Sequence, residues 1–330
     1  MNRSSTAALA LLALTGCIEE DRSDPALDGA REFASLLPTS ADLVMAVPGD
    51  TSERRSADEL DPFYVLTREA SGSVNGFVEN WLDTLHDIVS LTPVAEGEDA
   101  WAWGPMHQGE GGLAPTTEYL VVQREADGTF SYAVIEAARA EDDDRANYVP
   151  IIAGKLLGGT SVEDSFGWFA VDFTAAAEMD PMRDTVGHAV FAYDMVQGPL
   201  VVAALDDIAT GGEPATNALY GYIRGADGSG VMDVLVHGDV GGTDMEETWD
   251  LRSRWTADGA GRSDGQITGG DLGLQVATLN DCWAMGAQTV FYANDLAPET
   301  EYGDEADCAF AEESLPGTLP TWLREVLDAR

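Results

Sequence analysis

The feature that most constrains the fold is a long series of alternating polar and apolar segments that begins near Trp101. Short turns join these segments, and two of the turns, at 126–128 and 226–228, share the sequence Ala-Asp-Gly. Alternation with a period of two predicts strands, and such turns predict hairpins. About ten hairpin-linked strands without helices between them predict an antiparallel meander and exclude a βαβ fold. Beyond the first strand, at Trp101, the expected strands are 118–124, 129–137, 188–195, 200–205, 219–224, 231–237, 248–255, 274–279 and 282–293.

One long helix is expected before these strands, at residues 63–89. Apolar residues recur there at steps of three and four, as on one face of an amphipathic helix. Pro62 suits the first helical position, and we expect Gly72 and Gly76 where the sheet approaches closely. The predicted fold is α+β and mostly β: a curved antiparallel sheet, a half-barrel meander, packed around this helix. Shorter elements are expected as helices at 26–37 and 319–327 and a strand at 43–47.

The charge balance limits the partners. The chain has 330 residues, with 17 Lys and Arg against 59 Asp and Glu, for a formal net charge of −42. Nucleic-acid binding needs clustered basic side chains, so a nucleic-acid partner is excluded. Adsorption to an anionic membrane surface is disfavoured for the same reason.

The N-terminus has the layout of an export signal. Arg3 precedes an apolar run at 7–14, which is too short to cross a bilayer. The run ends in Leu14-Thr15-Gly16-Cys17, which resembles the lipobox of bacterial lipoproteins. This resemblance implies cleavage before Cys17 and attachment of acyl chains to it, and several chains give a stable anchor. The alternative is an ordinary secretory peptide with an incidental cysteine.

The lipobox divides the chain into three parts. Residues 1–16 are the expected signal peptide, 17–25 the lipidated cysteine and its tether, and 26–330 a single domain. By the lipoprotein sorting rule, Ile18 favours the bacterial outer membrane, with the periplasmic or cell-surface side left open. The other two cysteines, Cys282 and Cys308, are expected to form a disulfide in an oxidising compartment. A thiolate metal site is the alternative for this pair.

Catalytic motifs lack the context that their chemistry requires. The string Gly261-Arg262-Ser263-Asp264-Gly265 matches G-x-S-x-G, but its glycine-rich surroundings predict a solvated hairpin loop. The four histidines have no metal-ligand spacing, and Glu141-Asp142-Asp143-Asp144 lacks the pattern of a calcium loop. We therefore expect no catalytic residue, metal or cofactor.

Aromatic residues in the long helix and the strands offer a candidate ligand site. Packing of a core explains most of them. A second interpretation is a cavity between helix and sheet that admits an acyl chain or a hydrophobic peptide. Its candidate lining residues are Phe77, Trp81, Trp101, Trp103, Phe191, Tyr193, Trp249 and Trp255.

Two resemblances extend beyond the lipobox. The expected shape is similar to the half-barrel of the lipoprotein-carrier (Lol) family. Segments along most of the chain resemble a set of uncharacterised bacterial lipoproteins, which implies the anchor and the fold but no activity. These segments are Phe63-Tyr64-Val65-Leu66-Thr67-Arg68 with Val74-Asn75-Gly76, Trp101-Ala102-Trp103-Gly104-Pro105, Val171-Asp172-Phe173 with Met179-Asp180-Pro181, and Asp281-Cys282-Trp283 with Gly303-Asp304-Glu305-Ala306-Asp307-Cys308.

The expected function is that of a lipid-anchored cell-envelope protein. We expect a non-enzymatic binding or structural module that touches the membrane through its acyl chains and takes a lipid or hydrophobic peptide as ligand. One alternative is a carboxylate-dependent hydrolase of envelope polymers, which requires two acids that converge with raised pKa values. Another is a protein-interaction scaffold with an exposed apolar patch.

Overall fold

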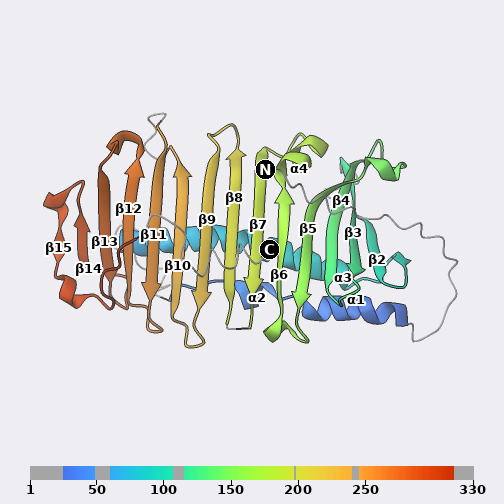
Figure 1. Cartoon of the computed structure of the whole chain (residues 1–330), viewed down its shortest axis with the longest axis horizontal. Coiled ribbons are helices and arrows are strands. Elements are labelled where there is room, and N and C mark those ends of the chain that lie inside the picture. The colour runs from blue at the N-terminus through green and yellow to red at the C-terminus, as the bar shows by residue number, and fades with distance from the viewer. Residues whose placement is uncertain (1–24, 49–59, 107–114, 197, 240–244, 316–330) are drawn as a thin grey trace.

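The described part of the chain forms one open antiparallel sheet (Figure 1). The structure is a computed structural model that describes residues 25–48, 60–106, 115–196, 198–239 and 245–315. Within these residues, 15 strands pair in sequence order, each with its neighbours along the chain. The two end strands, β1 and β15, lie at opposite ends of the sheet, which does not close. The antiparallel meander predicted from the hairpin pattern is therefore confirmed.

The strands within the described residues are β1 (Ala95–Glu96), β2 (Ala100–Met106), β3 (Thr116–Arg124), β4 (Phe130–Ala138), β5 (Val149–Gly158), β6 (Phe166–Asp172), β7 (Thr185–Asp194), β8 (Leu200–Thr210), β9 (Thr216–Arg224), β10 (Gly230–Gly238), β11 (Glu247–Trp255), β12 (Gly261–Gly269), β13 (Val276–Trp283), β14 (Thr289–Asn294) and β15 (Tyr302–Gly303). The helices are α1 (Pro25–Leu36), α2 (Ser40–Leu43), α3 (Pro62–Val89) and α4 (Phe173–Met179), with 3-10 turns at η3 (Arg145–Asn147), η4 (Val162–Asp164), η5 (Gly270–Leu272), η6 (Pro298–Thr300) and η7 (Glu305–Asp307).

Helix α3 runs across the strands on one side of the sheet, which we call the inner face (Figure 1). It begins where the sequence predicts, with Pro62 at the first helical position. Asp61 caps the N-terminus, because its side chain accepts a hydrogen bond of 2.8 Å from the Tyr64 N–H. Helix α1 contributes to the same core: the Phe33 ring lies 5.6 Å from that of Phe130, centroid to centroid.

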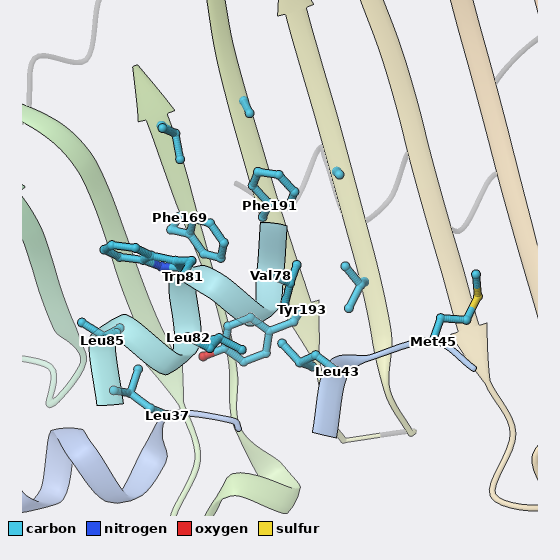
Figure 2. Close-up of a cluster of buried hydrophobic side chains, with 14 of the residues drawn as sticks. Leu37, Leu43, Met45, Val78, Trp81, Leu82, Leu85, Phe169, Phe191 and Tyr193 are labelled. Carbon is cyan, nitrogen blue, oxygen red and sulfur yellow. The ribbon is translucent and has the colours of Figure 1, made fainter. Parts of the chain in front are cut away.

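The core lies between the helices and the inner face. Figure 2 shows Trp81 of α3 beside Phe169 of β6, and Leu82 and Leu85 of α3 belong to the same core. Burial of such large apolar side chains is the main stabilising contribution to a fold of this kind. The apolar residues that recur at helical spacing through 63–89 thus lie on the side of α3 that packs against the sheet.

Several expectations about local structure were wrong. Residues 43–47 do not form a strand; α2 ends at Leu43, and the extended chain after it is held by side chains. The Asn75 amide binds both the N–H and the carbonyl of Met45, at 2.9 and 2.7 Å. Arg224 donates to the carbonyls of Asp42 and Val44. These contacts take the place of a partner strand.

Other corrections concern glycines and turns. An added Cβ at Gly72 or Gly76 would meet nothing within 4 Å, so the sheet does not approach α3 there. The segment expected as one strand at 282–293 contains a hairpin turn, since β13 ends at Trp283 and β14 begins at Thr289. Strand β5 and helix α4 were not expected. The helix predicted at 319–327 lies outside the described residues.

Candidate functional site

The aromatic side chains predicted to line a ligand cavity are instead packed against their neighbours. Phe77 stacks on Phe191 with ring centroids 4.5 Å apart, and Trp81 lies 5.8 Å from Phe169. Trp81 lies between α3 and strand β6, beside Phe169 (Figure 2). Of the eight predicted residues, six are buried in the core, namely Trp81, Trp101, Trp103, Phe191, Tyr193 and Trp255, while Phe77 and Trp249 are half-buried.

The eight predicted residues do not form one site. Phe77, Trp81, Phe191 and Tyr193 meet in the middle of the sheet. Trp101 and Trp103 lie on β2 and Trp249 and Trp255 on β11, far apart in the strand order.

A pocket does open to solvent at the other end of the sheet, beside the start of α3. Its walls are Pro62, Thr289, Tyr292 and Tyr302, and its volume is about 370 Å³. We call it the tyrosine pocket. Tyr292 and Tyr302 are directly opposite each other on β14 and β15, so their side chains share the inner face. Tyr302 is 62% exposed, which leaves the pocket accessible.

Two carboxyl groups lie next to the tyrosine pocket and beneath the surface. Asp61 directly precedes Pro62, and Asp281 is directly opposite Tyr292 across β13 and β14. Both aspartates are completely buried. The Asp61 N–H donates to the Ala287 carbonyl at 2.9 Å, which holds the start of α3 against the β13–β14 turn. We call Asp61 and Asp281 the carboxyl pair.

The protonation of Asp281 follows from its surroundings. An ionised carboxylate only accepts hydrogen bonds, and the donors beside Asp281 are the backbone N–H groups of Cys282 and Phe63, whose interaction with the carboxylate lowers its pKa less than burial and Asp61 raise it. Burial and, secondly, the neighbouring Asp61 raise the pKa of Asp281 to about 10. Asp281 is therefore neutral at pH 7, and its carboxyl proton can be donated in a hydrogen bond to the Asp61 carboxyl group.

A chain of hydroxyl groups continues from the carboxyl pair along the inner face. Ser263 is directly opposite Asp281, and its hydroxyl lies 2.7 Å from that of Ser253. The Ser253 hydroxyl is in turn 2.8 Å from that of Thr67 on α3. All three residues are completely buried. The first turns of α3 thus meet the sheet through these hydroxyls as well as through the Tyr64 ring, which lies 5.8 Å from that of Trp283.

This arrangement corrects the interpretation of the G-x-S-x-G string. Residues 261–265 were expected in a solvated loop but form the start of the buried strand β12. The hydrogen-bond partner of Ser263 is a hydroxyl, with no histidine in contact to act as a base. Among the described histidines, His86 contacts the carbonyl of Pro38, and His188 and His237 each lie beside one carboxylate.

The disulfide predicted between Cys282 and Cys308 is present, with an S–S distance of 2.08 Å. It fixes the C-terminal segment, residues 304–315, to the outer face of the sheet. An unbroken series of ion pairs does the same. In order it runs Asp233, Arg252, Glu313, Arg254, Asp264, Arg262 and Glu305, with N···O distances of 2.6–2.8 Å. We call it the ion-pair series.

The ion-pair series changes the expected character of β11. Arg252 and Arg254 alternate with apolar residues, which predicted a strand with one wet face. In the structure Glu313 covers both arginines, and Arg254 also lies over the Phe310 ring at 5.2 Å. The nearby Arg252 guanidinium lowers the pKa of Glu313. The outer face of β10–β13 is therefore closed by the C-terminal segment.

The remaining candidate sites are structural in the described residues. Within the acidic run at 141–144, Asp142 accepts from the Thr117 hydroxyl and Asp144 from the Ala146 N–H. In the residues that the structure describes, no group of three or more His, Cys, Asp or Glu could hold a metal ion. None of the described helices is both long and apolar enough to span a bilayer. Cys17, the predicted lipidation site, lies outside the described residues.

Sequence reasoning missed the tyrosine pocket and the carboxyl pair. Asp61 had a local signal, because an Asp followed by Pro before an apolar helical run is typical of a helix N-cap. Asp281 and the two tyrosines come together only through strand register, which no local pattern encodes. Comparison with known proteins returned no match, since no family model, curated protein or solved structure is significantly similar to the chain.

Proposed function

We propose that this chain is a lipid-anchored lipoprotein of the bacterial cell envelope that acts as a non-enzymatic binding module. The observation that carries the proposal is the lipobox-like Leu14-Thr15-Gly16-Cys17 directly after an apolar export segment. Acyl chains on Cys17 would hold the protein on the membrane, and Ile18 favours the outer membrane. The folded domain, beginning with α1 at Pro25, would then lie within a few residues of the lipid surface.

The tyrosine pocket is the proposed binding site. Between α3 and the middle of the sheet, Phe77 and Trp81 pack against aromatic rings of β6 and β7. The tyrosine pocket is open to solvent, so a ligand can reach it without displacing these side chains. Its aromatic wall suits a ligand with an apolar body, as the expected function requires.

Metabolic labelling with an alkyne fatty acid tests the anchor. The full-length protein, expressed in a bacterium that processes lipoproteins, should take up the label, and Cys17→Ala should take up none. The double variant Cys282→Ala, Cys308→Ala is the matched control, because it also removes thiols but should keep full labelling. Labelling of Cys17→Ala, or an unlabelled wild-type protein, would refute the proposed anchor.

A second candidate function, a hydrolase of envelope polymers, is favoured by the carboxyl pair. Asp281 has the raised pKa expected of a general acid, and Asp61 lies beside it. Both side chains are completely buried, so a polymer could not reach them without movement of α3. Binding therefore remains the first proposal. Release of soluble fragments from cell-wall polymer by the wild type, and its loss in Asp281→Asn, would favour the hydrolase instead.

A further inference from the structure

We propose that the tyrosine pocket binds a quaternary ammonium group, that is, a cation whose charge is covered by methyl groups. This inference rests on the proposed function, because it names the ligand class of the same pocket. Three features carry it: the aromatic wall, the acidic residues beside that wall, and the scarcity of hydrogen-bond acceptors in the lining.

The aromatic wall is suited to a cation. Tyr292 and Tyr302 stand side by side on the inner face of β14 and β15, with Pro62 across from them. The face of an aromatic ring carries partial negative charge, and it attracts a cation placed within about 6 Å of the ring centre. Two neighbouring tyrosines and a proline can surround a methylated head while the rest of the ligand extends into solvent.

The residues beside the tyrosine pocket are acidic. The carboxyl pair adjoins the aromatic wall, since Asp61 directly precedes Pro62 and Asp281 is directly opposite Tyr292 on the neighbouring strand. Tyr302 lies in a segment with exposed acids at Glu299, Glu301 and Asp304. From 263 to 323 the chain contains no Lys or Arg. An anionic ligand would be repelled here, whereas a cation would be attracted.

The lining distinguishes a quaternary from a primary ammonium group. A primary ammonium carries three N–H donors and loses affinity where these remain unpaired. The hydroxyls of Thr289, Tyr292 and Tyr302 are the only side-chain polar groups of the pocket lining, and that of Tyr292 already accepts from the Asn294 amide at 2.9 Å. A quaternary ammonium has no N–H group to satisfy, so it suits an aromatic wall with acidic residues beside it.

Calorimetric titration of the full-length lipoprotein, extracted in dodecyl maltoside, tests this inference. The probes are choline and 3,3-dimethylbutan-1-ol, which has the same shape without the charge. Choline should bind saturably, and the neutral probe about 10-fold more weakly. Ethanolamine, with a primary ammonium, should also bind more weakly than choline. Equal affinity for choline and the neutral probe would overturn the inference and leave the pocket as an apolar site of the proposed function.

Variants separate the ring from the charge. Tyr302→Leu keeps an apolar side chain at an exposed position but removes the ring, and should weaken choline binding about 10-fold. Tyr302→Phe should bind like the wild type. Asp61→Asn keeps a residue that caps helices well and removes the charge of the pair, so it should weaken choline but not the neutral probe. Tyr148→Leu, on the other half of the sheet, is the matched control and should change neither.

The outcomes distinguish this inference from the proposed function. Absence of saturable choline binding to a correctly folded wild-type protein would overturn the inference, while fatty-acid labelling of Cys17 would still support the anchor. Choline binding that is insensitive to Tyr302→Leu would place the ligand elsewhere and also overturn it.

Discussion

Asp281 shows how a single side chain can connect stability to pH. Its carboxyl group is buried at the junction of α3 and β13, where the neutral form is favoured. In the unfolded chain the same group would ionise near its ordinary pKa of 3.8, whereas in the folded chain its pKa is about 10. Between these values the folded state holds one proton more than the unfolded state. The free energy of unfolding must therefore fall as the pH rises through this window.

Asp281→Asn should remove this pH dependence. The amide supplies a permanent donor to Asp61 and has no proton to lose. We expect the variant to be more stable than the wild type by on the order of 3 kcal/mol at pH 8, with the difference shrinking towards pH 4. Urea unfolding at pH 5, 7 and 9 measures it. Asp83→Asn, which removes an exposed charge from the same helix, is the control; parallel pH profiles for wild type and Asp281→Asn would contradict the account.

Glycines that lie under tryptophan rings should not tolerate a methyl group. A Cβ at Gly261 would lie 2.2 Å from the Trp283 ring, and Trp283 is fixed by a hydrogen bond from its ring N–H to the Gly259 carbonyl. Gly261→Ala should destabilise the fold by about 2 kcal/mol. Gly72→Ala, on the open side of α3, should stabilise it by about 1 kcal/mol. Opposite signs in thermal unfolding are the result to look for; equal effects would show that local packing does not decide the outcome.

At the scale of elements, the C-terminal segment depends on the rest of the sheet for its position. The disulfide between Cys282 and Cys308 closes a loop of 26 residues, and the ion-pair series attaches the same segment through Glu305 and Glu313. Arg262 is completely buried, so removal of a partner would leave charge in a poorly solvated place. The two devices reinforce each other on the outer face.

Loss of either device should be measurable. Replacing Cys282 and Cys308 by Ser should lower the free energy of unfolding by about 3 kcal/mol.

Arg254→Met should lower the free energy of unfolding by about 3 kcal/mol, because Glu313 and Asp264 each lose a partner. In a double-mutant cycle, the Arg254→Met effect should be smaller once Glu313 is Gln. Strict additivity of the two substitutions would contradict the ion-pair series.

An element could be predicted from the sequence where the residues that determine it lie close together in the chain. Helix α3 was predictable because its apolar spacing and its Pro62 start lie within one segment. The alternation and the Ala-Asp-Gly turns similarly predicted the hairpins. The ion-pair series was not predictable, because Arg254 and Glu313 are 59 residues apart and the alternation alone indicated a solvated face. The tyrosine pocket depends on the register of β14 and β15 and on where α3 begins, and it was missed for the same reason.

At the scale of the whole molecule, the net charge of −42 works against the compact state. The edge strands β1 and β15 have two residues each, which leaves little free edge for pairing with a second copy. Repulsion between molecules and short edges together favour a protein that stays dispersed at high local density. A lipid-anchored domain on a crowded membrane surface would need that property.

Salt should stabilise this fold. Mobile ions screen repulsion between exposed carboxylates, while the buried part of the ion-pair series, Arg254, Asp264 and Arg262, is screened much less. We expect the midpoint of thermal unfolding to rise steadily from 0.05 to 1 M NaCl, in the wild type and in Tyr302→Leu alike. Circular dichroism melting curves measure this, with KCl as a check that the effect is not specific to sodium. A midpoint that falls with salt would indicate that surface ion pairs outweigh the repulsion.

The central claim, a lipid-anchored binding module, is tested most directly by the intact mass of the protein extracted from bacterial membranes. The account predicts a chain that begins at Cys17 and carries the added mass of a diacylglycerol thioether with an acylated amino terminus. A chain that begins at any other residue with an unmodified Cys17, or one that retains residues 1–16, would contradict it.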